Sequence, residues 1–414
     1  MAEERFRKKT VGGVSDADAR SYTVCYRAAA QHRGRRPSHN GILGKADRRM
    51  HVAFLYNESS EDPGLAAEEP NPAQSPIVAA LHRLGHRVTR ISCTLDLSAV
   101  RRRLERSRPD VVFNRVESLG GSDAMMAAIP LLLETIQLPY TGCSGAALAA
   151  TASKTAVKDK LVRAGLLTPP WITTDEARHG RGRTSASSVE PGGPGSRATN
   201  AKYIIKSVYE HASFRLDDSS IVEADNLEAV VRFLRRREVD FGRPLFAEQF
   251  IDGREFNLSI LGHELQILPP AEIDFCEFPA GKPRIVGHSA KCDPSSFEFH
   301  HTPRRFDFPP SDAALLRRLA ELTSECAEVF NLNGYARIDF RCDAAGEPWI
   351  LEINANPCLS PTSGFPAALA RAGYRYDDAI QRLLDDAWQP PSALRRAKSN
   401  RSPRVCRPAS APGS

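Results

Sequence analysis

The residues best suited to chemistry lie between Gly334 and Pro357 of this 414-residue chain. Two runs of alternating apolar and polar residues, 335–341 and 349–354, flank a turn-forming segment, 343–348, and this arrangement predicts a β-hairpin. Side chains alternate between the two faces of a strand, so one face of the hairpin is apolar and the other is polar. The polar face carries Arg337, Asp339, Glu352 and Asn354.

A hairpin register centred between Ala345 and Gly346 places Asp339 opposite Glu352. The same register pairs Arg337 with Asn354, Ile338 with Ile353, and Phe340 with Leu351. Opposed carboxylates repel unless a cation lies between them, and a donor set made only of oxygens suits Mg²⁺ or Mn²⁺ better than zinc. The alternative is a solvated strand face with an Arg–Asp salt bridge. The rigid polar loop 356–361, which follows directly, favours the metal interpretation.

Charge is distributed unevenly along the chain. Residues 1–49 hold 12 Lys/Arg against 5 Asp/Glu, and residues 393–414 hold 6 Lys/Arg and no acid. The whole chain carries +6, so residues 50–392 carry −7. We therefore expect disordered basic ends around a mildly acidic body, and this charge argues against nucleic-acid binding by that body. The basic ends could still recruit nucleic acid or an acidic partner.

The nine cysteines show neither CxxC nor CxxxC spacing, which indicates no zinc site and no disulfide framework and fits a cytoplasmic protein. No apolar run approaches the roughly 20 residues that span a bilayer. The first 49 residues lack the apolar core of a secretory signal, and Glu3, Glu4, Asp16 and Asp18 count against a transit peptide. The folded part is expected to start at Met50, with the preceding segment a disordered extension or a wrongly assigned start.

Periodicity predicts an α/β protein that is α+β in its central and C-terminal parts. An N-terminal domain with a parallel sheet, residues 50–145, is expected from strands at 51–56, 86–91 and 110–114 and helices at 76–84, 97–107 and 122–135, with a helical stretch at 144–165 following. A central unit, 146–250, is expected from strands at 171–174, 203–207 and 244–250 and a helix at 226–236. The segment 177–200, rich in Gly, Ser, Arg and Pro, is expected to be a flexible insertion. A C-terminal unit, 251–392, is expected from a β region at 255–270, a helix at 311–330 and the hairpin.

Two lysines and a serine add a second candidate cluster. Lys206 closes the apolar strand 203–205, and a phosphate would explain a lysine there, although such a lysine often simply reaches solvent. The loop after it can offer backbone amides and the Ser213 hydroxyl to a nucleotide. Lys154 lies on the predicted helical stretch and could equally be an ordinary surface lysine.

Taken in order, these features resemble the ATP-grasp superfamily, and within it the D-alanine-D-alanine ligase-like branch, over residues 50–388. The resemblance rests on the following runs: Pro139-Tyr140-Thr141-Gly142 with Ser153-Lys154, Tyr203-Ile204-Ile205-Lys206, Ala247-Glu248-Gln249-Phe250-Ile251 with Gly253-Arg254-Glu255-Phe256, Ala290-Lys291, and Arg337-Ile338-Asp339 with Glu352-Ile353-Asn354-Ala355-Asn356-Pro357. It implies an ATP-grasp fold with an N-terminal parallel-sheet domain.

The resemblance also implies roles for individual residues. Lys154 and Lys206 would hold the α- and β-phosphates of ATP, and Lys291 would reach the γ-phosphate. The segment Glu248, Gln249, Phe250 and Ile251 would grip adenine, and Glu255 would accept the ribose hydroxyls. The metal ligands would be Asp339, Glu352 and Asn354, with Glu352 able to bridge two Mg²⁺ ions. Arg337 would stabilise the acyl phosphate and the tetrahedral intermediate. Ser360 and Ser363 would hold a substrate carboxylate, and Glu117, which follows a strand end, either contacts the substrate amine or lies in a solvent-facing loop.

The implied activity is an ATP-dependent carboxylate–amine ligase that forms an amide bond through an acyl phosphate, with small molecules such as amino acids as substrates. The resemblance also allows a homodimer. Several residues depart from the dipeptide ligases: the phosphate loop 210–215 has no glycine, the segment 114–121 lacks a His-Gly pair, and Cys358 replaces a glycine. The alternative is a catalytically impaired ATP-binding protein of the same fold with a regulatory or partner-binding role.

Overall fold

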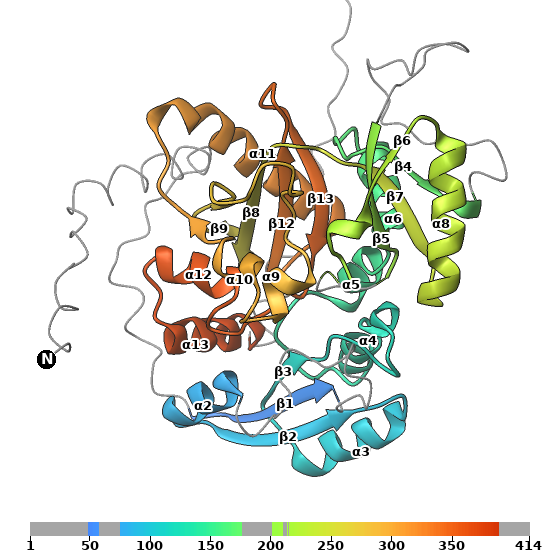
Figure 1. The fold of residues 1–414 in the computed structure, drawn as a ribbon. Helices are drawn as coiled ribbons and strands as arrows, with labels where there is room; N and C mark the ends of the chain where they lie inside the picture. The colour runs from blue at the N-terminus through green and yellow to red at the C-terminus, as the bar shows by residue number, and fades with distance from the viewer. Residues whose placement is uncertain (1–48, 58–74, 176–200, 210–212, 214, 389–414) are drawn as a thin grey trace, which may run out of the picture.

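The computed structural model describes residues 49–57, 75–175, 201–209, 213 and 215–388 (Figure 1). The described helices and strands form three sheets with helices packed against them, a mixed α/β architecture. The expected basic extension, the insertion 177–200, the tail after residue 392 and most of the phosphate loop 210–215 lie outside the described residues. The boundaries expected for the three units stay predictions.

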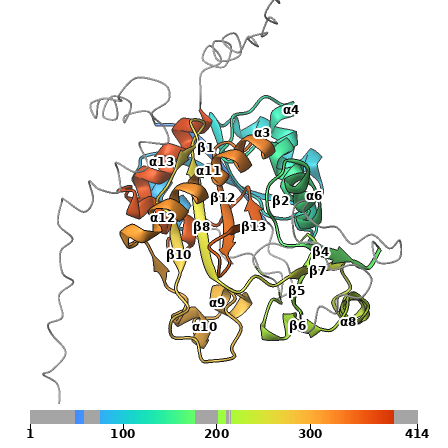
Figure 2. The same cartoon turned by 90° about the horizontal axis from the view of Figure 1, so that it is seen from above.

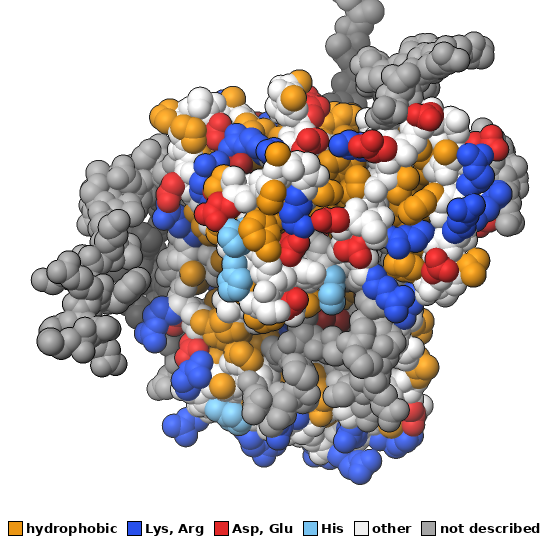
Figure 3. All heavy atoms as spheres, in the orientation of Figure 1, with side chains coloured by type: hydrophobic (Ala, Val, Ile, Leu, Met, Phe, Trp, Pro, Cys, Tyr) orange, Lys and Arg blue, Asp and Glu red, His pale blue; other side chains and the backbone are white. Residues whose placement is uncertain are grey.

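The first sheet is parallel, as predicted, with the order β2-β1-β3. Its strands are β1 (His51–Asn57), β2 (Arg87–Cys93) and β3 (Val111–Arg115), and its helices are α2 (Pro76–Arg83), α3 (Leu97–Ser107) and α4 (Ala128–Thr135). The helix predicted over 122–135 is wrong at its start, because a short 3₁₀ turn, η4 (Asp123–Met125), precedes α4. In Figure 3, Lys and Arg side chains gather along the lower rim, where Figure 1 places β2 and α3. The exposed arginines of α3 belong to this rim.

Two helices connect the first sheet to the second. The continuous helical stretch predicted over 144–165 is wrong, because α5 (Gly145–Thr151) and α6 (Lys154–Arg163) are separate helices. The Ser153 side chain accepts a hydrogen bond from the amide of Ala156, so Ser153 acts as the N-cap that starts α6 afresh. This restart places Lys154 at the first position of α6, where the helix meets the cleft described below.

The second sheet is antiparallel, with the order β4-β7-β5-β6. Its strands are β4 (Trp171–Thr173), β5 (Ala201–Ser207), β6 (Ile221–Ala224) and β7 (Leu245–Gln249), and η5 (Asp218–Ser220) precedes β6. The helix α8 (Leu227–Phe241) packs on this sheet through its buried residues Val230, Val231 and Leu234. Figures 1 and 2 agree that α8 lies on the side of the second sheet away from the third.

The third sheet has the path β11-β10-β8-β12-β13, with β9 paired to β8. Its strands are β8 (Arg254–Leu261), β9 (Gln266–Ile267), β10 (Ala271–Ile273), β11 (Arg304–Arg305), β12 (Tyr335–Cys342) and β13 (Pro348–Asn354). The helix α11 (Ala313–Phe330), preceded by η6 (Pro310–Asp312), packs its buried face on this sheet. Together with residues of α5 and α6, the helix and the sheet form the largest apolar cluster of the described residues. Burial of this cluster holds the hairpin β12–β13 in place from its apolar side.

The predicted hairpin register is correct from Arg337 to Asp339 and wrong from Phe340 onward. Asp339 pairs with Glu352, as predicted, and so do Arg337 with Asn354 and Ile338 with Ile353. The pairing of Phe340 with Leu351 is wrong, because a β-bulge after Asp339 brings Ile350 opposite Phe340. Leu351 is the extra residue of the bulge and lines the cleft, while Ile350 takes the buried position.

Four helices were not predicted: α9 (His288–Cys292), α10 (Phe297–His300), α12 (Gly364–Arg371) and α13 (Tyr376–Ala387). The last of these packs against α2, and the Arg83 guanidinium on α2 forms a 2.6 Å ion pair with Asp377 on α13. The C-terminal helices therefore lie against the first sheet as well as the third. Among the described residues, no helix has the length and apolar character needed to cross a membrane.

Candidate active-site cleft

A cleft of about 1360 Å³ opens between the three sheets. It exceeds the volume of roughly 300–1,000 Å³ that suits a drug-sized ligand, so it has room for a nucleotide with further substrates. Every candidate residue expected from the sequence contributes to its lining. They are Glu117, Lys154, Lys206, Ser213, Glu248, Gln249, Phe250, Ile251, Glu255, Lys291, Arg337, Asp339, Glu352, Asn354, Ser360 and Ser363.

The paired carboxylates of the hairpin have cationic partners within the chain. Arg337 donates two hydrogen bonds to Asp339, from Nε to Oδ1 at 2.7 Å and from Nη2 to Oδ2 at 2.8 Å, and the Asn257 amide donates to Oδ1 at 2.9 Å. The Lys154 ammonium lies 3.7 Å from Glu352. Desolvation would lower the pKa of Arg337, but the charge and hydrogen bonds of Asp339 outweigh it and raise that pKa. The repulsion expected between Asp339 and Glu352 is therefore relieved by side chains, without any requirement for a metal.

The donor set of the hairpin nevertheless fits a hard divalent cation. Asp339 and Glu352 offer carboxylate oxygens and Asn354 offers an amide oxygen, on neighbouring strands and on one face. Mg²⁺ typically takes one or two carboxylates and completes its shell with water and phosphate oxygens. Among the described residues, no group of three or more His, Cys, Asp or Glu side chains is arranged to hold a metal ion. A cation at this hairpin would therefore rely on two carboxylates, one amide and ligands from outside the chain.

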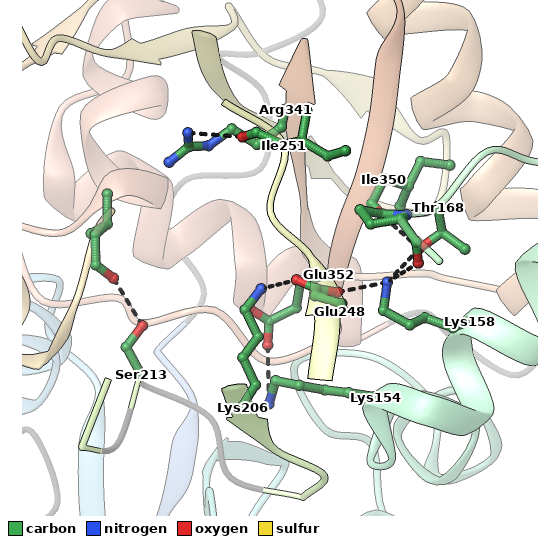
Figure 4. Close-up of polar contacts among 12 residues, drawn as sticks. Lys154, Lys158, Thr168, Lys206, Ser213, Glu248, Ile251, Arg341, Ile350 and Glu352 are labelled. Atoms are coloured by element: carbon green, nitrogen blue, oxygen red, sulfur yellow. Dashed lines mark hydrogen bonds and ion pairs between the residues drawn. The ribbon is translucent and has the colours of Figure 1, made fainter. Parts of the chain in front are cut away.

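Glu248 lies between two lysines, as Figure 4 shows. Its Oε1 accepts a short hydrogen bond from Lys206, and its Oε2 lies 2.7 Å from the Lys158 ammonium in an ion pair rather than a well-aligned hydrogen bond. Burial alone would raise the pKa of the Glu248 carboxyl, but the charges of Lys158 and Lys206 outweigh it and lower that pKa. The Glu248 side chain thus forms an ion pair with Lys206, a contact that the sequence did not indicate.

The segment expected to grip adenine is held against the hairpin by Arg341. This buried arginine of β12 donates to the carbonyls of Ile251 at 3.3 Å and Gly253 at 3.4 Å. It also donates two hydrogen bonds to Oε2 of Glu255, at 3.0 and 2.8 Å. Both bonds fall on Oε2, and within the described part of the chain Oε1 of Glu255 accepts no hydrogen bond. Oε1 can therefore accept one from a ligand in the cleft that Glu255 lines.

Gly253 permits this close approach of the segment to β12. A Cβ added at Gly253 would lie 1.8 Å from the carbonyl oxygen of Cys342. No side chain fits at that distance, so the backbone position accepts only glycine.

Lys291 and Ser213 border the cleft from two short segments. Lys291 lies on α9, and the amide of His288, at the start of that helix, donates to the carbonyl of Leu216 at 2.8 Å. Ser213 has a left-handed backbone with φ of 57°, and its hydroxyl donates to the carbonyl of Val286 at 3.1 Å. The segment before α9 is thus tied to the segment around Ser213, which brings the two side chains to one side of the cleft.

The far end of the cleft holds Glu117, Ser360 and Ser363. Arg115 donates to Glu117 at 2.5 Å and also to the carbonyl of Pro357 at 3.4 Å, which joins β3 to the loop after the hairpin. The Ser363 hydroxyl donates to the carbonyl of Cys358 at 2.7 Å, so it holds the loop as well as facing the cleft.

Arg304 on β11, which the sequence did not single out, also lines this end and donates to the carbonyl of Thr362 at 3.2 Å. Desolvation and, after it, the charge of Arg337 lower the pKa of Arg304. Two guanidinium groups therefore influence the same end of the cleft.

Comparison with known proteins gives a consistent result. A family model described as "D-ala D-ala ligase C-terminus" matches residues 204–385. The D-alanine–D-alanine ligase of Synechococcus sp. (strain JA-3-3Ab) is 30% identical over 341 residues, which cover 78% of this chain and 90% of that ligase. The D-alanine–D-alanine ligase of Moorella thermoacetica is 28% identical over 345 residues, which cover 82% of this chain and 100% of that ligase.

The fold is shared with a solved structure. The crystal structure of the D-alanine–D-alanine ligase from Bacillus anthracis complexed with ATP superposes with a TM-score of 0.57 at 17% identity. The match covers 84% of this chain and 99% of that one. The ATP-grasp fold expected from the sequence is confirmed.

Proposed function

We propose a metal, a nucleotide pose and a substrate class for the cleft, on the premise that this chain belongs to the D-alanine–D-alanine ligase family and is an ATP-dependent carboxylate–amine ligase. One observation carries the proposal. Two lysines, Lys154 and Lys206, line the same cleft as the paired carboxylates Asp339 and Glu352. A triphosphate with its metal ions satisfies both sets, because the lysines bind phosphate oxygens and the carboxylates bind the metal.

Asp339, Glu352 and Asn354 would hold two Mg²⁺ or Mn²⁺ ions, with Glu352 as the bridging ligand. The donor chemistry and the placement of these residues on one face support this assignment. When bound, the ions neutralise charge on the phosphates. A cation held there would share Asp339 with Arg337, which would leave the Arg337 guanidinium available for the reacting groups.

The nucleotide would lie along the segment 248–251, with adenine against Phe250 and Ile251 and the ribose hydroxyls donating to Oε1 of Glu255. Lys154 and Lys206 would bind the α- and β-phosphates as point charges. Lys291 and Ser213 would reach the γ-phosphate. Each of these residues lines the cleft, and Arg341 fixes the backbone of the segment through two carbonyls.

The chemistry has two steps. An oxygen of the carboxylate substrate attacks the γ-phosphorus, and ADP leaves with the electron pair of the broken P–O bond. The neutral amine of the second substrate then attacks the acyl carbon, phosphate leaves with the bonding electron pair, and the proton that the amine loses is taken up by the released phosphate. Arg337 would stabilise the negative charge that develops on the acyl phosphate and on the tetrahedral intermediate. Ser360 and Ser363 would bind the carboxylate of the second substrate. Glu117, held by Arg115, would bind a substrate amine.

The substrates proposed are two small amino acids. The relatives named D-alanine–D-alanine ligase make D-alanine the first amino acid to test at both positions. A homodimer and a cytoplasmic location stay predictions.

The test is an incubation of the full chain with ATP, Mg²⁺ and a panel of D- and L-amino acids, singly and in pairs. Phosphate release is followed over time, and mass spectrometry identifies the product. We expect phosphate release that depends on an amino acid, together with a dipeptide that carries the masses of the two substrates. Calorimetry run alongside distinguishes the alternative, because tight ATP binding with no phosphate release across the panel indicates a catalytically impaired protein.

A further inference from the structure

Lys158 is a fully buried lysine that the proposed function leaves without a role. It lies on α6, one turn beyond Lys154, and only 1% of its surface is exposed. It does not line the cleft. Its partner Glu248 does, and so does Lys206, which contacts Glu248 from the other side. Figure 4 shows Lys158 on one side of Glu248 and Lys206 on the other. An ammonium ion buried at this depth needs compensation from its neighbours.

The surroundings of Lys158 fix the position of its ammonium group. Besides the 2.7 Å ion pair with Glu248, it donates to Oγ1 of Thr168 at 2.7 Å and to the carbonyl of Pro169 at 3.2 Å. The Thr168 hydroxyl in turn donates to the carbonyl of Ile350 at 2.8 Å. Ile350 lies on β13, the strand that also carries Glu352. A continuous series of contacts therefore runs from the strand of the metal ligands to the lysine at the cleft surface.

The charges of Lys158 and Glu248 determine how readily the Lys206 ammonium can bind a phosphate. Glu248 alone beside Lys206 forms a neutral pair, in which the carboxylate competes with any phosphate for the Lys206 ammonium. With Lys158 present, the three side chains carry one net positive charge, and Glu248 divides its attraction between two ammonium groups. Because charges interact strongly where water is excluded, the second lysine weakens the hold of Glu248 on Lys206.

We propose that Lys158 is a positioning residue that, by neutralising Glu248 from behind, keeps Lys206 available to the phosphates of ATP. The proposal rests on the function proposed above, because it assumes that Lys206 binds a phosphate. The dependence between Lys158 and Glu248 runs both ways. Burial lowers the pKa of the Lys158 ammonium, and the charge of Glu248 opposes that shift. Each of the two groups thus helps the other to stay ionised.

A purely structural ion pair would affect folding without a selective effect on ATP, so the test compares variants that separate charge from packing. Lys158→Gln removes the charge and can still donate a hydrogen bond to Thr168. Thr168→Val keeps the charge and removes the tie to Ile350, and Lys160→Gln removes a charge from the same helix outside this series. Lys158→Arg restores the charge. The dissociation constant of ATP with Mg²⁺, the KM of each amino acid and the midpoint of thermal unfolding are measured for every full-length variant.

We expect Lys158→Gln to bind ATP about tenfold more weakly, which corresponds to roughly 1.4 kcal/mol of coupling, while the KM of the amino acids changes less than about twofold. Thr168→Val lowers the unfolding midpoint but leaves the ATP dissociation constant within about twofold, as does Lys160→Gln. Lys158→Arg recovers most of the affinity. Equal losses of ATP affinity in Lys158→Gln and Thr168→Val would overturn the proposal, because they would reflect packing.

A double-mutant cycle with Lys158→Gln and Glu248→Gln tests whether Lys158 acts through Glu248. If Lys158 acts through the charge of Glu248, then Lys158→Gln changes the ATP dissociation constant by less than about twofold in a Glu248→Gln background. This comparison remains decisive even if Lys158→Gln alone fails to fold, since the double variant contains no unpaired buried carboxylate. A tenfold loss in the Glu248→Gln background would overturn the proposal. A wild-type protein that binds no ATP would instead refute the proposed function, and this inference with it.

Discussion

Arg337 holds both carboxylate oxygens of Asp339, at 2.7 and 2.8 Å, from a position two residues away on the same strand. The residue proposed to stabilise the acyl phosphate is thus bound to a residue proposed to hold the metal. A cation that takes Asp339 weakens this pair, so the two tasks are coupled through one carboxylate.

Replacement of Arg337 by methionine is expected to lower kcat by a factor of roughly 10² to 10³, the usual effect of removing one donor to a developing negative charge. The KM for ATP should change less than about threefold, because Arg337 is not proposed to bind the nucleotide. Steady-state kinetics with the best amino acid pair measures both constants, and Arg318→Met, an exposed arginine on α11, is the control. An unchanged kcat in Arg337→Met would contradict the assigned role.

Glu352→Gln is expected to abolish phosphate release at the Mg²⁺ concentration that saturates the wild-type protein. The change removes the charge that pairs with Lys154 at 3.7 Å and that would bridge the two ions. A Mg²⁺ titration of phosphate release at fixed ATP measures the effect. Glu347→Gln, on the exposed turn of the same hairpin, should titrate like the wild type. If Glu352→Gln titrates like the wild type as well, the metal assignment is wrong.

Gly253→Ala is expected to unfold the protein partly or to displace the segment 248–251, because the added methyl group would meet the carbonyl oxygen of Cys342 at 1.8 Å. ATP affinity and the thermal midpoint should both fall. Gly346→Ala is a suitable control, since a Cβ there has nothing within 4 Å, and its positive φ of 83° should cost only about 1 kcal/mol of unfolding free energy. Equal behaviour of the two variants in calorimetry and ATP titration would argue against the close packing described.

The contact between Arg83 and Asp377 predicts a pH dependence of stability. The hydrogen bond from Arg83 lowers the pKa of Asp377 below its usual value of 3.8. A carboxylate with a lowered pKa adds stability at pH values above its unfolded pKa, and this contribution is lost as the pH falls through the lower, folded pKa. Asp377→Asn should therefore be less stable than the wild type near neutral pH. The difference should shrink as the pH falls below 3.8 and vanish once the pH is below the lowered pKa of the folded protein. Urea unfolding at several pH values measures this, and a difference that persists in acid would rule out the ion pair as its source.

The sequence contained enough information to predict the polar face of the hairpin and its pairing at Asp339 and Glu352. These depend on the two-residue period of a strand and on a turn near residue 345, and both are local signals. The parallel order of the first sheet was predictable for the same reason, from strands that alternate with helices. The placement of the candidate residues around one cleft depended further on the resemblance to a known family.

Contacts between distant segments were not predictable. Lys158 looks like an ordinary helix lysine in sequence, and only the approach of β7 and of residue Thr168 gives it buried partners. Arg341 likewise resembles a strand residue exposed to solvent until the carbonyls at 251 and 253 are brought to it. The restart of the helix at Ser153 had a local signal, a serine N-cap, that the periodic apolar pattern obscured.

The bulge at Leu351 divides the hairpin into two segments with different strand registers. On one side of it Glu352 is opposite Asp339, and on the other Ile350 is opposite Phe340. Deletion of Leu351 would join these two alignments into one regular ladder without shifting either pair. Such a shortened chain would keep its carboxylates and its core but lose one apolar side chain from the wall of the cleft. Changes at this single position would thus alter the hydrophobicity of the cleft wall without altering its charge or the stability of the sheet behind it.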